Sequence, residues 1–75
     1  MFKYHINIFY CEDDGDFIAD VPDLRGCSAF GDTPQEALKE AIVAIEMWIE
    51  AAESMNKEIP EPRYKPAIYQ TYQTV

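Results

Sequence analysis

The chain has 75 residues, of which 48% are hydrophobic and 13% aromatic, with fourteen acidic and six basic side chains and a formal net charge of −8. This length allows one domain, and the hydrophobic content excludes a disordered acidic tail. Such an acidic surface repels phosphate groups. We therefore expect no direct binding to nucleic acid and favour a basic protein as partner.

The first part of the chain is predicted to form a β-hairpin. Apolar side chains alternate over residues 2–11, which indicates a half-buried strand. Phe9 and Cys11 make its second face apolar as well, so we expect the far end of this strand to be covered on both sides. An acidic run with a glycine at residues 12–16 suits the turn, and alternation resumes at residues 17–21 as the returning strand.

A helix is predicted from residue 34 to about residue 55. Thr33 can cap its N-terminus, Pro34 suits the first helical position, and Glu36 is placed as the capping-box partner. Asn56 tolerates the left-handed conformation that ends many helices. Apolar residues at spacings of three and four are expected to pack on the sheet: Leu38, Ala41, Ile42, Ile45, Ile49 and Ala52.

Two further segments complete the predicted order. Residues 27–30 are expected to form a short third strand, since Pro22 ends the second. Residues 62–75 form an extended or strand-forming tail that is rich in β-prone residues. The prediction is therefore a single domain over residues 1–75, an α+β fold of β-β-β-α-β order with one long helix packed on a mainly antiparallel sheet.

The sequence does not suggest an active site. His5, the only histidine, falls on the polar face of the first strand, with no serine or cysteine predictably beside it. One histidine and the distant Cys11 and Cys27 give no metal-ligand spacing. Aspartates between residues 13 and 23 could hold Mg²⁺ for phosphoryl chemistry, but they read more simply as a solvated turn and its flanks. We therefore expect no enzyme activity, no cofactor and no metal.

The N-terminus gives no sign of secretion. Residues 1–6 alternate instead of forming a basic region followed by an apolar run, and no apolar stretch approaches the roughly 20 residues that span a bilayer. With two cysteines and no secretion signal, we expect a cytoplasmic protein with free thiols.

A domain of this size has a marginal core, and many such domains gain stability from a second subunit. The predicted helix is apolar over more of its circumference than packing on one sheet requires. The β-prone tail contains Tyr69 and Tyr72. These features predict a homodimer through one of two elements, with the following candidate interface residues: Val43, Met47, Trp48, Tyr69 and Tyr72.

Several segments in a fixed order resemble one known family over about residues 4–62. They are Asp14-Gly15-Asp16-Phe17-Ile18-Ala19, Pro22-Asp23-Leu24-Arg25-Gly26-Cys27, Ala29-Phe30-Gly31-Asp32-Thr33-Pro34-Gln35-Glu36-Ala37-Leu38, Ala41-Ile42, Trp48-Ile49-Glu50 and Ile59-Pro60-Glu61-Pro62. The set resembles the HicB-like antitoxins of type II toxin–antitoxin systems. The family often has proline where Arg25 stands here.

The resemblance implies a partial RNase H-like fold without that fold's catalytic carboxylates. It also implies a partner of the HicA type, a small basic toxin that cuts mRNA, and a short form without the DNA-binding domain that many full-length antitoxins carry. In that case the likeliest contacts with the toxin are the clustered carboxylates: Asp13, Asp14, Asp16, Asp20 and Asp23. Two alternatives stay open, a stand-alone homo-oligomeric regulatory or ligand-binding protein without a toxin, and an RNase H-like metal-dependent nuclease.

Overall fold

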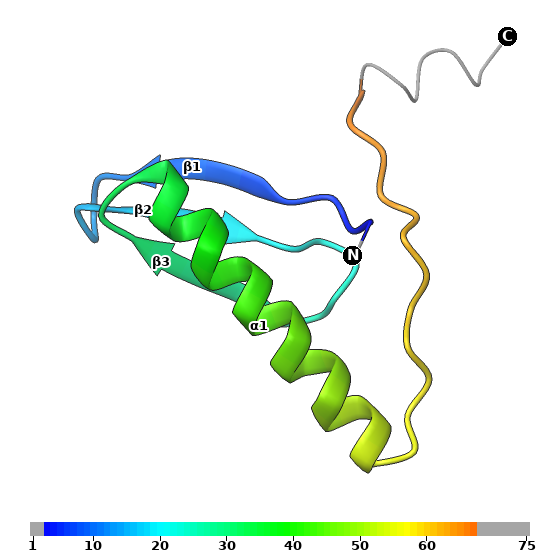
Figure 1. Ribbon diagram of the computed structural model, residues 1–75. Coiled ribbons are helices and arrows are strands. Elements are labelled where there is room, and N and C mark those ends of the chain that lie inside the picture. Colours follow the sequence, from blue (N-terminus) through cyan, green and yellow to red (C-terminus); the bar gives the residue numbers. More distant parts are fainter. Residues whose placement is uncertain (1–2, 68–75) are drawn as a thin grey trace, which may run out of the picture.

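The protein is described by a computed structural model, which places residues 3–67. The elements in this part of the chain are β1 (Asn7–Cys11), β2 (Asp16–Asp20), β3 (Ser28–Gly31) and α1 (Pro34–Ser54). The strands lie in the order β1-β2-β3 with both pairs antiparallel, and α1 crosses one face of the sheet (Figure 1).

This arrangement confirms the predicted α+β class, with one long helix on an antiparallel sheet. Within the predicted tail, the described part forms no strand, and residues 68–75 lie outside the described residues. In the described part of the chain, no helix is long and apolar enough to cross a membrane.

The hairpin forms where the sequence predicts it, but its first strand is shorter. At the turn, Gly15 has a φ of 69° and its N–H group donates to the carbonyl of Cys11 at 2.9 Å. β1 begins at Asn7, which is paired with Asp20, instead of at residue 2. Pro22 follows shortly after and has no N–H group for the ladder, which explains why the pairing stops there.

Both ends of α1 are capped as the sequence predicts. The Thr33 hydroxyl accepts a hydrogen bond from the N–H group of Glu36 at 3.1 Å, and the Glu36 carboxylate accepts one from the N–H group of Asp32 at 3.1 Å. At the other end Asn56 has a φ of 57°, and the N–H group of Lys57 donates back into the last helical turn at 2.8 Å. The C-terminus of α1 therefore ends in a Schellman motif.

The helix packs on the sheet through small residues, which corrects part of the predicted apolar stripe. Leu38 and Ile42 were predicted to pack there but are 40% and 43% exposed. The reason is the close approach of helix and sheet at Gly31, where an added Cβ would lie 2.4 Å from the backbone nitrogen of Ala37. This approach turns the alanines toward the sheet. The buried helix residues are Ala37, Ala41, Ile45 and Ala52.

The core extends beyond the strands into the loop between β2 and β3. Leu24 is 1% exposed and forms a buried cluster with Val21, Cys27 and Ile45. Within the loop, the Leu24 N–H group donates to the Val21 carbonyl and the Cys27 N–H group to the Leu24 carbonyl, at 3.1 and 3.0 Å. The loop therefore packs against the C-terminal half of α1.

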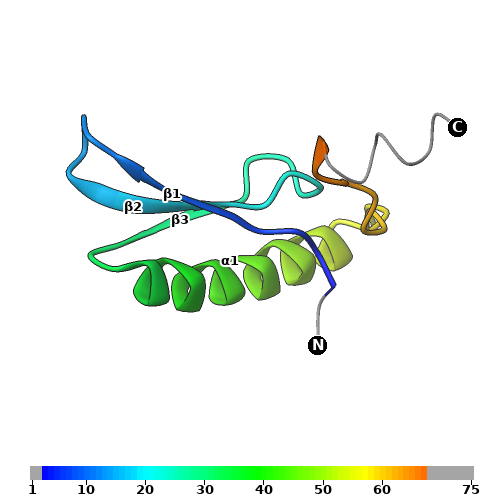
Figure 2. The same cartoon turned by 90° about the horizontal axis from the view of Figure 1, so that it is seen from above.

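The sheet has one covered and one open face. Ala19 and Ala29 are buried against α1, whereas no described element covers the opposite face (Figure 2). Phe9 lies on that opposite face and is 48% exposed. The prediction that the far end of the first strand is covered on both sides is therefore wrong for the described chain, because the single helix can cover only one face.

Candidate partner-binding surface

An apolar row crosses the open face of the sheet. Phe9 is paired with Ile18 on β2, and Ile18 is paired with Phe30 on β3, so the three side chains stand side by side on one face. Phe9 and Phe30 are 48% and 53% exposed, while Ile18 between them is half-buried. We call these three residues the aromatic row. The row has no signature in the sequence alone, because it depends on strand register.

Carboxylates lie on either side of Ile18, the middle residue of the aromatic row, along β2. Asp16 and Asp20 alternate with the helix-facing residues and therefore share the open face with Ile18. Asp13 and Asp14 lie exposed in the hairpin turn next to Asp16. Residues 4–24 contain six acidic side chains and no lysine or arginine. Four of the five predicted contact aspartates thus share the open face or the adjoining turn.

Asp23, the fifth of these aspartates, has a different environment. Its carboxylate accepts hydrogen bonds from the backbone N–H group of Arg63 at 3.1 Å and from that of Tyr64 at 3.1 and 3.0 Å. These bonds hold the extended segment after α1 against the loop that follows β2. Asp23 therefore has a structural role within the chain.

Two aromatic contacts hold the same segment against the N-terminal residues. The Tyr4 hydroxyl donates to the carbonyl of Pro60, and the ring of His5 lies 4.6 Å from that of Tyr64. Burial, together with the charges of Asp23 and Glu61, raises the pKa of Tyr4 above its usual value. His5, predicted on the polar face of the first strand, lies before β1 and is in a packing contact with Tyr64.

The acidic residues do not converge on a metal site. Within residues 3–67, no group of three histidine, cysteine or acidic side chains is arranged to hold a metal ion. Cys11 is half-buried, Cys27 is buried, and the two thiols are not bridged. Burial, and to a lesser extent the charge of Asp20, raises the pKa of the Cys27 thiol.

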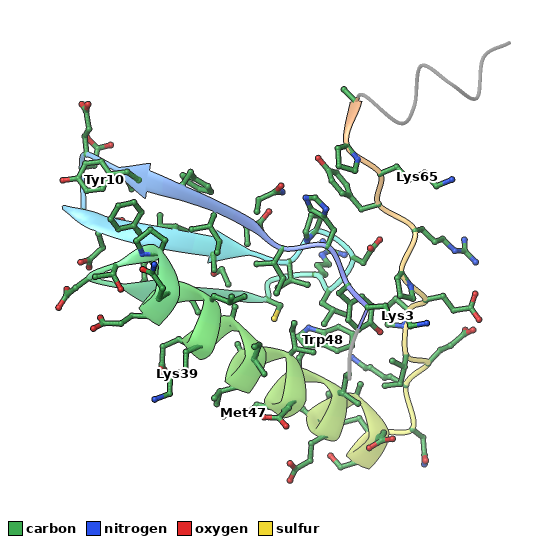
Figure 3. All side chains as sticks on the ribbon, turned by 45° about the horizontal axis from the view of Figure 1, so that its top comes forward. Lys3, Tyr10, Lys39, Met47, Trp48 and Lys65 are labelled. Carbon is green, nitrogen blue, oxygen red and sulfur yellow. The ribbon has the colours of Figure 1, made fainter. Side chains whose placement is uncertain are left out.

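The outer flank of α1 holds the described part of the predicted dimer interface. Val43 and Met47 are 43% and 65% exposed. Trp48 is half-buried, and its indole N–H group donates to the carbonyl of Arg25 at 3.0 Å. Figure 3 shows Trp48 directed toward that loop and Met47 on the outer side of the helix. The other two candidates, Tyr69 and Tyr72, lie outside the described residues.

Comparison with known proteins identifies the family. The sequence model described as HicB-like antitoxin of bacterial toxin–antitoxin systems matches residues 4–72. The chain belongs to the HicB-like antitoxin family. Two curated relatives are UPF0150 proteins, one from Synechocystis sp. and one from Thermoplasma acidophilum. Each is 39% identical over 58 residues, which covers 77% of this HicB-like chain and 78% or 83% of the relative. No solved structure matches the chain significantly.

Membership of this family bears on the kind of partner that the open sheet face would contact. An antitoxin acts on a toxin, so membership of the HicB-like family implies a toxin partner in general. No described element covers the open sheet face or the acidic turn, and Asp13, Asp14, Asp16 and Asp20 lie there.

Proposed function

We propose that this HicB-like chain is a non-catalytic antitoxin that neutralises a small basic mRNA-cleaving toxin of the HicA type by covering its surface. The observation that carries the proposal is the segment over residues 4–24, which has six acidic side chains and no lysine or arginine and part of which borders the open sheet face. Such a local field attracts a basic protein and repels RNA, so the antitoxin would compete with the toxin's substrate for the toxin.

We also propose that the antitoxin forms a homodimer through the outer flank of α1. Val43 and Met47 expose apolar surface there, and a domain of this size gains stability when such surface is buried. Light scattering should give twice the 8.6 kDa mass of one chain. The Val43→Ser/Met47→Ser double variant should be a monomer. A wild-type chain that remains monomeric at high micromolar concentration would exclude the dimer.

We place the activity in the cytoplasm, where mRNA is available to the toxin. The two unbridged thiols support a reducing compartment, since they fit a protein that does not depend on a disulfide. The absence of enzyme activity is part of the proposal. Purified chain with Mg²⁺ or Mn²⁺ should leave RNA and RNA–DNA hybrids intact, and cleavage that disappears in Asp14→Asn or Asp20→Asn would favour a metal-dependent nuclease instead.

A growth assay tests the antitoxin function directly. The reading frames beside the gene of this chain are searched for a small basic HicA-type protein, which is then induced alone and together with the chain while colony formation and cellular mRNA are followed. We expect the toxin alone to stop growth and the chain to restore it, with a stable complex of the two purified proteins. Continued mRNA cleavage and arrested growth at equal expression of both proteins would refute the proposal.

A further inference from the structure

We propose that the aromatic row is the buried centre of the interface with the basic partner, and that Asp16 and Asp20 form its acidic rim. The inference rests on the proposed function and names the surface and the chemistry of the partner. The partner presents an apolar patch that is bordered by lysine or arginine side chains. The acidic turn adds long-range attraction but lies beside the contact.

The first support is the geometry of the row. Strand pairing aligns Phe9, Ile18 and Phe30 across all three strands, so the three side chains make one continuous apolar strip on a rigid sheet. About half of each phenylalanine is exposed. Aromatic side chains are enriched at protein contacts, because they bury a large area at a small cost in side-chain entropy. A strip of this kind on a monomer surface marks an interaction site.

The second support is the charge around the row. Asp16 and Asp20 lie on the same strand and face as Ile18, one on either side of it, so they flank the middle of the row. Residues 4–24 supply no lysine or arginine to balance them. An apolar centre with a charged rim is the usual anatomy of a specific protein interface, and here the rim has one sign. Lysine or arginine side chains at the edge of the partner's patch would complement it.

The same charge argues against the two other candidate occupants. A second copy packed on this face would bring the carboxylates of Asp16 and Asp20 close to the same residues of the other copy. Like charges placed opposite one another across an interface oppose binding. A nucleic acid would meet the same repulsion through its phosphates. A basic protein is the occupant that both the apolar row and its rim favour.

The experiment compares two double variants of matched exposure in titration calorimetry and surface plasmon resonance. The probe is the HicA-type toxin with its catalytic histidine replaced by alanine. Phe9→Ser/Phe30→Ser removes the row, whereas Leu38→Ser/Ile42→Ser removes side chains that are 40% and 43% exposed on α1. We expect the row variant to lose about 30-fold or more in affinity, mainly through faster dissociation, because central aromatic residues dominate interface energies. The helix variant should stay within about threefold of wild type, since contacts outside such a centre are nearly neutral.

Two controls keep a folding defect apart from a binding defect. Thr33→Ala weakens the helix cap without touching the open face, so it should bind like wild type although it is less stable. Amide chemical-shift mapping on the ¹⁵N-labelled wild-type chain needs no substitution. Addition of the toxin should shift the amides of β1, β2 and β3 around the row more than those of the outer flank of α1.

Each outcome decides a separate question. A wild-type chain that fails to bind the toxin refutes the proposed function and the inference with it. A wild-type chain that binds, with the row variant binding equally well and the shifts confined to α1, overturns the inference alone. If light scattering shows a wild-type dimer that the row variant converts to a monomer, a second copy occupies the face and the inference is also overturned.

Discussion

The backbone N–H group of Tyr64 donates to both carboxylate oxygens of Asp23, at 3.1 and 3.0 Å, across 41 positions of sequence. The N–H group of Arg63 donates to the same carboxylate at 3.1 Å. Asp23 belongs to one of the segments that carry the family resemblance, so part of that resemblance reflects a structural requirement. The carboxylate fixes the chain after α1 beside the loop between β2 and β3.

Loss of this carboxylate should therefore release the C-terminal segment. We expect Asp23→Ala to lower the free energy of unfolding by about 1–2 kcal/mol, since hydrogen bonds to a charged group contribute this much and the site is partly solvated. Amide hydrogen exchange at Arg63 and Tyr64 should accelerate. The matched control is Asp14→Ala in the exposed turn, which should change neither quantity. Unchanged amide exchange in the Asp23 variant would show that its carboxylate does not hold the C-terminal segment.

The orientation of α1 can be tested with two isoleucines at neighbouring positions on the predicted stripe. Ile45 is 1% exposed, whereas Ile42 is 43% exposed. We expect Ile45→Ala to lower the free energy of unfolding by about 3 kcal/mol and Ile42→Ala by less than about 1 kcal/mol, because only the first leaves a cavity. Urea unfolding followed by circular dichroism measures both. Equal losses would mean that the helix is rotated toward the predicted stripe.

Much of the fold could be predicted from local signals. The capping residues Thr33 and Glu36, the left-handed Asn56 and the alternation predicted over residues 17–21 act over a few residues; the structure confirms the caps and places the strand at Asp16–Asp20. Such signals depend on backbone preferences that are the same in every protein. They therefore place both ends of α1.

What the sequence could not supply depends on relations between elements. The rotation of α1 follows from its close approach to Gly31, and the aromatic row follows from the register that pairs Phe9 with Ile18 and Ile18 with Phe30. Neither relation has a local signature, since a one-residue slip in register would move every side chain to the other face. The place of Asp23 was missed for the same reason, because its donors lie far along the chain.

The contact between β3 and the start of α1 leaves no room for a side chain at Gly31. A Cβ there would lie 2.4 Å from the backbone nitrogen of Ala37. We expect Gly31→Ala to lower the free energy of unfolding by about 1–3 kcal/mol, as overpacking does in other cores. Ser28→Ala, on an exposed position of the same strand, should have an effect of less than about 0.5 kcal/mol. Thermal unfolding of the two variants in parallel tests this, and an unaltered Gly31 variant would show that the helix can move away.

The two thiols should differ in reactivity. Burial raises the pKa of the Cys27 thiol, so at a given pH it holds less of the reactive thiolate and is also less accessible, whereas Cys11 is only half-buried. In the native protein at pH 8, excess Ellman's reagent should react quickly with one thiol per chain and slowly with the second. Cys11→Ser should remove the fast phase and Cys27→Ser the slow one. Two phases of equal rate would indicate that the loop around Cys27 opens freely.

The acidic turn should affect the association rate of the toxin more than its dissociation rate. Reversal of three charges, in the Asp13→Lys/Asp14→Lys/Asp16→Lys variant, removes the attraction near the open face. We expect association to slow by about tenfold at low salt, with a smaller change in dissociation, because clustered charges act mainly on encounter. Physiological salt should reduce the difference, since exposed charges are then screened over about 8 Å.

The matched control for this variant carries the same change in net charge at another place. Glu40→Lys/Glu50→Lys/Glu53→Lys reverses three exposed charges on α1, away from the open sheet face. Stopped-flow mixing with the histidine-replaced toxin gives both rate constants for each variant. If only total charge matters, both triple variants will slow association equally. If the field near the turn guides the toxin to the open face, the α1 variant will slow association by less than about threefold, since its charges lie on the helix that packs against the opposite face of the sheet.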